Sequence, residues 1–302
     1  MTDTDELFTL KNAFYLGSYR EAIDEASTLK LKSDALRLEK DVLVQRSYIG
    51  LGQSSKVLTD INESTAPVAL LAVRALARYL TSPDSKQDVV AQFEAWLADV
   101  NSSTSPTVQS LAAIVFIHES KPHAALRALR SFSTLESLAL SIQVYLRIDR
   151  VDLAEKQLRV LQERDDESAL YQLCAAQVSL ALGGERYQEA FSTYQEMLQR
   201  YGEDSVSVTN GLCAALVCLG RNEQAETSLK ESLAKEPANP ETLITYLTLL
   251  QNTGRGLGGS PTDAATANKL LATLKKTSPG HPYVTALNLV ENSFDRVAAG
   301  FK

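Results

Sequence analysis

The sequence predicts an all-α protein, a right-handed α-solenoid of about eight helix pairs with one further helix capping its C-terminal end. Three observations lead to this prediction. A small residue returns about every 34 residues, a turn signal lies shortly before most of these positions, and the segments between them have helical periodicity. The recurring positions are Ala22, Lys56, Ala91, Ala125, Ala154, Ala190, Ala225 and Ala267, of which only Lys56 is not alanine.

A period of about 34 residues is typical of the tetratricopeptide repeat, a helix–turn–helix unit that stacks on its neighbours. The recurring residue must be small because the two helices of a repeat cross most closely there. One repeat cannot bury its apolar face alone, so the stack supplies the core and presents a large surface. We therefore look for function on that surface.

The turns follow the same order in each repeat. In the first repeat Gly17 separates one helix from a second that begins near Tyr19. Glycine is expected at such a turn because it adopts left-handed backbone angles without steric cost. The third repeat stretches its turn through residues 82–85, and Asp149-Arg150 makes the turn without glycine. The other glycine turns are expected at Gly52, Gly184 and Gly220.

The clearest repeat runs from about residue 207 to 239. Its second helix contains Ala225 and stops at Pro237, and Asn239-Pro240 then provides an N-cap and a first-turn proline for the next helix. The last repeat carries a glycine-rich insertion at residues 254–261. Helices flank this insertion on both sides, so we interpret it as a flexible insertion and not as a dinucleotide-binding loop, which needs a preceding strand.

A final helix is expected from about His281 to Ala299, after the helix-breaking Pro279-Gly280. It would cover the open end of the stack, as repeat arrays require. We therefore predict a solenoid over residues 1–280 and a capping helix of the same domain over residues 281–302.

Several first helices are apolar almost all round, as at residues 111–117, 173–182 and 243–250. Such helices must be covered on both sides, one side by stacking and the other by something else. The second helices alternate charged and apolar residues, as at 154–162 and 225–234, and are expected to face water. The first helices should then line the concave side of the solenoid.

Counting from the recurring alanine predicts an uncharged partner-binding groove. This groove indicates a neutral or apolar polypeptide partner, because a large apolar concavity left empty in water is unfavourable. The alternative is that some of these side chains pack against the neighbouring repeat. The expected groove residues are Ile114, Ile117, Gln143, Leu146, Ser179, Leu182, Ala214, Val217, Ile244 and Thr248.

Composition argues against other classes of protein. The net charge is −7 without a Lys/Arg cluster, so we expect no nucleic-acid or direct lipid partner. The first residues are acidic where a signal peptide is basic, and no apolar run reaches the roughly 18 residues of a membrane span. Cys174, Cys213 and Cys218 lie in apolar helical segments, where we expect buried thiols and no disulfide framework. A cytosolic protein is therefore expected.

No catalytic constellation, cofactor-binding motif or metal site is expected. The chain has three histidines, and two of them, His118 and His123, flank Pro122 at a turn, a poor geometry for binding one metal ion. Phe93 and Trp96 are spaced as core residues of a helix. The enzymatic alternative, a helical-repeat transferase, would need an acid/base cluster inside the concavity.

A second alternative is a peptide-binding adaptor or co-chaperone. Such proteins grip a peptide carboxylate with Lys, Arg and paired Asn on their first helices. Here the first repeat offers Lys11 and Asn12, but the second offers Gln45 and Arg46, and the central repeats carry no groove charge. The clamp is incomplete, which disfavours this alternative.

The strings DELF (5–8), KNAFYLGSY (11–19), DLAEKQL (152–158), SLALGG (179–184) and NPETL (239–243), with the ending from HP (281–282) through NSFDR (292–296), run along the whole chain. Together they resemble the epsilon subunit family of coatomer, the COPI vesicle coat. The resemblance implies a non-catalytic coat subunit of Golgi-to-endoplasmic-reticulum and intra-Golgi transport, on the cytosolic face of Golgi membranes. It also implies that the solenoid grips the carboxy-terminal region of the alpha subunit, with membrane contact only through the assembled coat. The glycine-rich insertion departs from the family pattern.

Overall fold

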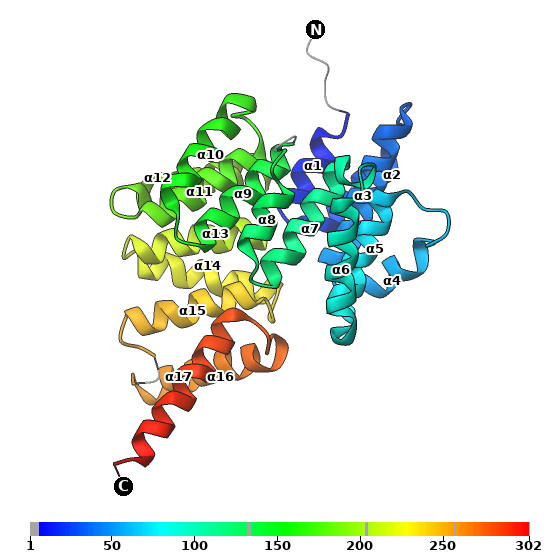
Figure 1. Ribbon diagram of the computed structural model, residues 1–302. Coiled ribbons are helices and arrows are strands. Elements are labelled where there is room, and N and C mark those ends of the chain that lie inside the picture. The colour runs from blue at the N-terminus through cyan, green and yellow to red at the C-terminus, as the bar shows by residue number, and fades with distance from the viewer. Residues whose placement is uncertain (1–5, 132–133, 203–204, 257, 302) are drawn as a thin grey trace. The chain divides into compact units, whose positions relative to one another are not determined.

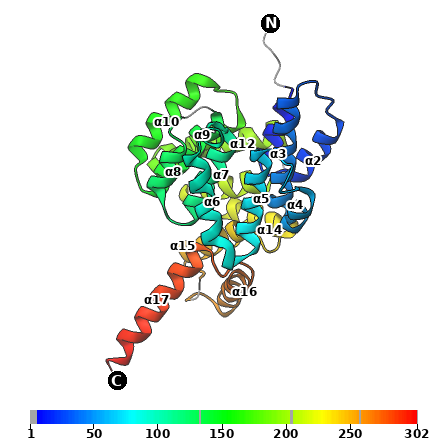
Figure 2. The same ribbon diagram turned by 45° about the vertical axis from the view of Figure 1, so that its right-hand side comes forward.

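The computed structural model describes residues 6–131, 134–202, 205–256 and 258–301, and these residues contain seventeen α-helices, two short 3-10 helices and no strand. The all-α prediction is confirmed, and in chain order the helices correspond to the eight expected repeats followed by α17 (Figures 1 and 2). Each pair matches one expected repeat. Below, the first helix of a pair is called an inner helix.

The described chain forms two compact units, and the first comprises the residues up to Arg186 together with Arg200–Ser205. The expected boundary at residue 280 stays a prediction. The helices of the first unit are α1 (Phe8–Tyr15), α2 (Tyr19–Thr28), α3 (Asp34–Gly50), α4 (Ser54–Asp60), α5 (Val68–Thr81), α6 (Lys86–Ala98), α7 (Pro106–His118), α8 (Pro122–Ala128), α9 (Leu135–Arg147), α10 (Val151–Arg164) and α11 (Ala169–Leu182), with 3-10 helices η1 (Pro83–Ser85) and η2 (Ser102–Thr104).

The second unit comprises Tyr187–Gln199 and the residues from Val206 onward. Most of α12 (Arg186–Tyr201) belongs to it, while both ends of that helix belong to the first unit. The other helices of the second unit are α13 (Val206–Cys218), α14 (Asn222–Lys235), α15 (Pro240–Asn252), α16 (Pro261–Thr277) and α17 (Pro282–Ala299).

The turns inside the pairs use left-handed backbone angles, as expected. Gly17, Gly52 and Gly220 have φ angles of 83°, 75° and 72°. Asp149 makes the same turn without glycine at φ 58°, and Ser120 does so at φ 56°. In the third repeat η1 joins the two helices instead, which accounts for its longer turn.

Replacing Gly220 by alanine should lower the free energy of unfolding by about 1 kcal/mol, because an L side chain is strained at a left-handed φ. A β-carbon at Gly220 would meet no atom within 4 Å, so the cost is conformational and not steric. Gly280 has equally open surroundings without a left-handed φ, which makes Gly280→Ala the matched control. Urea unfolding should separate the two variants; equal stability would show that the turn does not need this conformation.

The recurring alanine is buried where the helices of a pair meet, as at Ala22, Ala125 and Ala225. At two positions the expected register is wrong. Lys56 and Ala91 are exposed, and the neighbouring Val57 and Val90 are buried in their place. In the third repeat η1 precedes α6 and changes the phase at which that helix meets the core. The shift in α4 does not follow from its length, since α8 also has 7 residues and keeps Ala125 buried.

The inner helices of the first unit close into a ring. Contacts run from α1 to α3, α5, α7, α9 and α11 in turn, and α11 contacts α1 again. Two long-range polar contacts join distant parts of the circuit. The Ser205 hydroxyl donates to the Leu16 carbonyl at 2.5 Å, and Arg46 of α3 pairs with Glu136 of α9. The concave side of this unit is therefore the interior of a closed circuit of inner helices.

The apolar inner helices are covered largely by the protein itself. In α7 eight of the 13 residues are buried, because α5 and α9 flank it in the ring and α6 and α8 pack behind it. The expectation that something else covers the second side of these helices is therefore wrong for α7. Phe93 of α6 is fully buried in the same core, and Trp96 packs partly buried against it.

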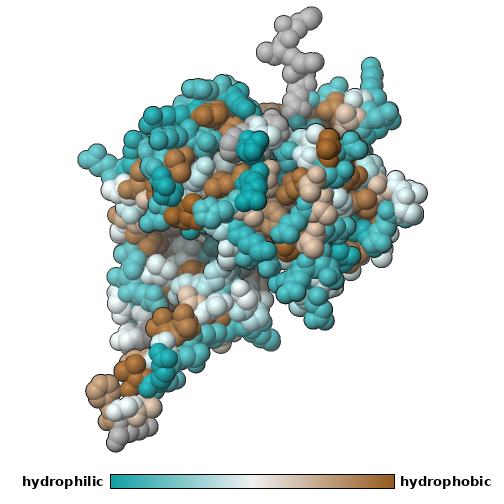
Figure 3. Space-filling model, viewed as in Figure 1, coloured by the Kyte–Doolittle hydropathy of each residue, from teal (hydrophilic) through white to brown (hydrophobic). Residues whose placement is uncertain are grey.

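Helix α17 begins one residue after the expected start, with His281 as its N-cap. Only Val284 of α17 is buried, and further along the helix Glu291 pairs with Lys275 of α16 at 3.0 Å. The first half of α17 therefore holds it against its unit. Five large apolar side chains in and just after the rest of the helix are exposed, and Figure 3 shows hydrophobic residues gathered there. They are Leu289, Val290, Phe294, Val297 and Phe301.

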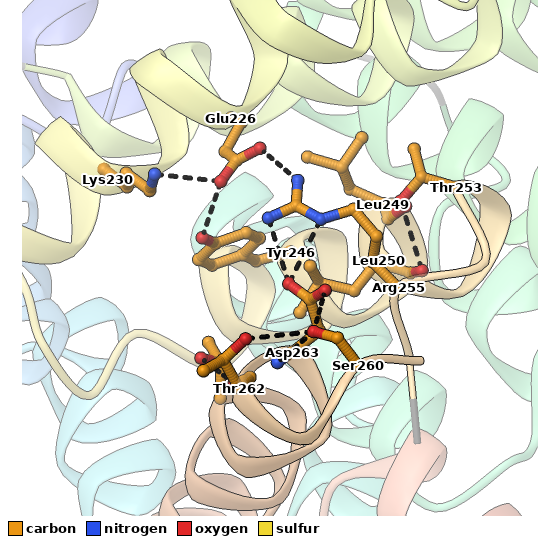
Figure 4. A network of polar contacts seen from close by, with 11 residues as sticks. Glu226, Lys230, Tyr246, Leu249, Leu250, Thr253, Arg255, Ser260, Thr262 and Asp263 are labelled. Atoms are coloured by element: carbon orange, nitrogen blue, oxygen red, sulfur yellow. Dashed lines mark hydrogen bonds and ion pairs between the residues drawn. The ribbon is translucent and has the colours of Figure 1, made fainter. Parts of the chain in front are cut away.

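The glycine-rich insertion of the second unit is anchored by an ion-pair network (Figure 4). Arg255 pairs with Glu226 of α14 at 2.7 Å and with Asp263 of α16 at 3.1 Å. Lys230 also pairs with Glu226, at 2.8 Å, and Ser260 caps α16. These contacts tie both ends of the insertion to helices, whereas the sequence had suggested only a flexible loop.

Glu226→Gln should lower the stability at pH 7 by roughly 1 kcal/mol, because both of its ion-pair partners are exposed and water screens the contacts. Hydrogen bonds from Arg255 and Lys230 lower the pKa of Glu226 from 4.5 to about 2. A lowered folded-state pKa means that the contribution is complete above pH 4.5 and disappears as the pH falls toward 2. Urea unfolding at several pH values should show the two proteins converging over this range. The exposed Glu231 of the same helix provides the control substitution, Glu231→Gln.

Candidate functional site: the interior of the helical ring

Two cavities, of about 240 and 450 Å³, lie inside the ring of the first unit. Both are lined by Tyr15 of α1, Arg46 of α3, Glu136 of α9 and Leu170 of α11. Their lining comes mostly from the inner helices, because these helices face the ring interior while the second helices pack outside them. The prediction that the first helices line the concave side is confirmed for this unit.

A buried ion pair divides the interior. The Arg46 Nη2 atom lies 2.5 Å from the Glu136 Oε1 atom, and the two side chains are only 10% and 16% exposed. The guanidinium group also lies over the Phe14 ring, 4.7 Å from its centroid. This arrangement combines a bidentate pair with a cation–π contact. The two opposite charges therefore cancel inside the cavity.

The neighbouring Tyr15 stays protonated at neutral pH. Burial raises its pKa well above 10.0, and the negative charge of Glu136 raises it further. Burial would lower the pKa of Arg46, but the charge and hydrogen bonds of Glu136 raise it overall. The interior thus contains one ionised pair and a neutral phenol, which is not the arrangement of a general acid or base.

Of the expected groove residues in the first unit, the structure brings together Ile114 and Gln143, which line the smaller cavity. The Gln143 amide donates a hydrogen bond to the Gln177 side-chain oxygen, which links α9 to α11. The remaining four lie further toward the C-terminal ends of the same inner helices. They are Ile117, Leu146 and Ser179, all half-buried, and Leu182, which is 41% exposed.

The other expected groove residues belong to the second unit, so the ten positions form two separate sets. Ala214 and Val217 are half-buried on α13, and Ile244 and Thr248 are half-buried on α15. Val217 and Ile244 pack against the core of their unit. The Thr248 hydroxyl is satisfied by the Ile244 carbonyl at 2.9 Å.

The sequence did not single out the aromatic and charged lining of the ring. Phe14, Tyr15 and Tyr19 cluster in the first pair, and this local concentration of rings was a usable signal. The pairing of Arg46 with Glu136 had no such signal, because 90 residues separate them. An interior without charge was therefore expected where the structure has a neutralised pair.

The candidate carboxylate clamp is occupied by internal contacts. Lys11 pairs with Glu39 at 2.9 Å, Asn12 is buried, and Arg46 is held by Glu136. A peptide carboxylate would have to displace one of these acids. The structure therefore gives no support to a clamp at these positions.

Reactive side chains are few. Burial raises the pKa values of Cys174 and Cys213 to about 12, so both thiols stay protonated at neutral pH. Cys218, expected to be buried, is exposed instead, because it lies on the last turn of α13. The described residues contain no group of three or more His, Cys, Asp or Glu that could hold a metal ion. Within the same ranges no helix is both long and apolar enough to cross a lipid bilayer.

Comparison with solved structures bears on the fold alone. A tetratricopeptide repeat protein from Parabacteroides merdae matches 89% of this chain and 97% of its own, with a TM-score of 0.59 at 12% identity. The Cut9–Hcn1 hetero-tetramer of APC/C matches 91% of this chain and 53% of its own, with a TM-score of 0.60 at 16% identity. Both similarities agree with a solenoid of stacked helix pairs.

Comparison with sequences bears on identity. The family model described as coatomer epsilon subunit matches residues 3–302. Coatomer subunit epsilon-1 of Arabidopsis thaliana is 34% identical over 301 residues, covering 100% of this chain and 99% of the plant protein. Coatomer subunit epsilon of Dictyostelium discoideum is 29% identical, covering 96% of this chain and 97% of its own. The chain therefore belongs to the coatomer epsilon subunit family, and it is a structural, non-catalytic component of the COPI coat in vesicle-mediated transport.

Proposed function

We propose that this protein holds the carboxy-terminal region of the coatomer alpha subunit on the concave side of its solenoid. It does so as part of the coat on the cytosolic face of Golgi membranes, in Golgi-to-endoplasmic-reticulum and intra-Golgi transport. The coat reaches the membrane through its other components. Family membership supports the coat, and the character of the ring interior supports the mode of binding.

The observation that carries the proposal is the charge balance of the ring interior. The charged side chains that line its two cavities pair with each other, as Lys11 with Glu39 and Arg46 with Glu136. The remaining lining is apolar, aromatic or neutral polar. A surface of this kind suits a permanent neutral partner, since obligate interfaces are more apolar than transient ones.

The exposed apolar face of α17 supports assembly in a second way. Leu289, Phe294 and Val297 are 68%, 72% and 57% exposed on one helix. Clusters of large apolar side chains at a surface mark sites that a partner covers. A coat subunit that is always assembled tolerates such a face.

The double substitution Leu146→Asp and Leu182→Asp should reduce capture of the recombinant alpha-subunit carboxy-terminal region by at least about tenfold. The reason is that binding would then bury two carboxylates against an apolar partner surface. Leu146 is half-buried, so Leu182→Asp alone serves as a second variant at an exposed site. Val160→Asp, on the outer helix α10 at a position 38% exposed, is the matched control.

Circular dichroism establishes that each variant keeps its helicity. Undiminished capture by both groove variants would refute the groove assignment. Affinity purification from cytosol tests the partner separately. Recovery of a stoichiometric coat complex supports the proposal, and recovery of a chaperone alone would favour the adaptor alternative.

A further inference from the structure

A cleft of about 570 Å³ lies on the first unit, between α6, η2, α7 and α8 and apart from the ring interior. Its apolar lining includes Leu97 of α6, Phe116 of α7 and Ala124 and Ala128 of α8. This volume is within the range of about 300–1,000 Å³ that is usual for ligand sites. It is large enough for an apolar side chain together with its neighbours in a peptide.

The cleft is held open by a buried amide. Gln109 is buried, and its side-chain nitrogen donates to the Ser103 carbonyl at 2.6 Å. Its side-chain oxygen accepts a hydrogen bond from the Ser131 hydroxyl at 2.7 Å. One side chain of α7 thus ties η2 to the residues that follow α8, and all three residues line the cleft. The site is formed before any ligand arrives.

Two arginines of the cleft are available to a ligand. Both are exposed; Arg127 lies in the last turn of α8, and Arg130 lies in the turn that follows that helix. Neither forms an ion pair with any residue in the described ranges, whereas Arg46, Arg74 and Arg255 all do. They are local cations on a chain of net charge −7.

The acid in the cleft does not neutralise these arginines. Glu94 lines the cleft, but its carboxylate lies 3.9 Å from the Lys121 ammonium group. Two guanidinium groups beside an apolar floor are complementary to carboxylates that flank a large apolar side chain. A free inorganic anion would use the arginines but not Leu97 or Phe116.

We propose that this cleft binds a short acidic peptide segment of another protein, with carboxylates on Arg127 and Arg130 and a large apolar side chain on the floor between α6 and α8. This inference does not depend on binding of the alpha subunit by the ring. It gives the coat subunit a second, outward docking site of different chemistry.

The probe is a fluorescein-labelled peptide, Gly-Asp-Asp-Leu-Phe-Asp-Glu-Gly, whose anisotropy is followed as the full-length protein is added. Arg127→Glu with Arg130→Glu should weaken binding at least about tenfold, because like charges then face each other. Arg159→Glu with Arg164→Glu changes the net charge equally on exposed positions of α10 and should leave the affinity within about twofold. Added salt should weaken the wild-type complex.

Two further probes test the ligand class. A peptide with Asn and Gln in place of the acids should bind at least about tenfold more weakly, and so should one with Ser in place of Leu and Phe. Equal binding of the Ser peptide, or full competition by millimolar phosphate, would overturn the proposal in favour of a simple anion site. If the Arg127/Arg130 and Arg159/Arg164 double variants lost the same amount of peptide affinity, binding would depend on net charge alone. The Leu146→Asp and Leu182→Asp variant should bind the peptide normally, which separates this test from that of the ring.

Discussion

Arg46→Met is expected to destabilise the protein by about 3 kcal/mol, because it leaves the Glu136 carboxylate inside the ring without its partner. The Arg46 and Glu136 side chains are only 10% and 16% exposed, so a carboxylate left without its partner is poorly solvated there. The pair also joins α3 to α9 across the interior, and the loss should affect the closure of the ring. Chemical denaturation followed by circular dichroism measures the change.

Glu136→Leu combined with Arg46→Met should restore much of this stability, since replacing a whole buried ion pair by apolar groups is often close to neutral. The exposed pair of Arg150 and Asp152 supplies the control, because Arg150→Met removes a 2.8 Å ion pair whose side chains are 52% and 56% exposed. The free energy of unfolding of the Arg150→Met control should stay close to that of the wild type. If the single and double variants at Arg46 were equally unstable, the cost would lie in lost packing and not in the unpaired charge.

Phe93→Ala should have a comparable or larger effect, a loss of about 3–5 kcal/mol. Phe93 is fully buried in the core of the first unit, and its ring meets the Trp96 ring edge to face at a centroid distance of 5.3 Å. The substitution leaves a cavity that the surrounding helices cannot fill without moving. Trp96 is the only tryptophan of the chain, so its fluorescence should report the change locally.

Phe294→Ala is the matched control, because Phe294 of α17 is 72% exposed and its removal leaves no cavity. Its midpoint of unfolding should stay near that of the wild type. A Phe93 variant as stable as this control, with unchanged Trp96 fluorescence, would mean that α6 does not pack as the structure shows.

Local features were predictable from the sequence, because turns and helical periodicity depend on nearby residues. Gly17, Gly52 and Gly220 marked their turns, and Asp149 was recognised without glycine. The failures at Lys56 and Ala91 arise because a repeat count assumes a constant helix phase. In the third repeat η1 alters that phase before α6, and in the second repeat the core takes Val57 in place of Lys56.

The candidate site was less predictable. Counting residues from the recurring alanine predicted correctly that Ile114 and Gln143 face the interior. Such a count describes one helix at a time, and it does not give the rotation between one repeat and the next. The lining by Phe14 and Tyr15 depends on α1 meeting α11, which no pattern within a repeat indicates. The sequence predicted that α17 caps the stack, whereas most of its apolar side chains are exposed. A sequence shows which side chains are apolar but not what covers them.

The sequence by itself determined eight helix pairs and one further helix, and their order, because these follow from spacing within about 34 residues. Only the tertiary structure decided that six inner helices close into a ring. Closure depends on contacts between residues far apart in the chain, Arg46 with Glu136 and Ser205 with Leu16, 90 and 189 positions apart. Such contacts depend on the small rotation between successive repeats, which adds up along the stack and has no local signature in the sequence.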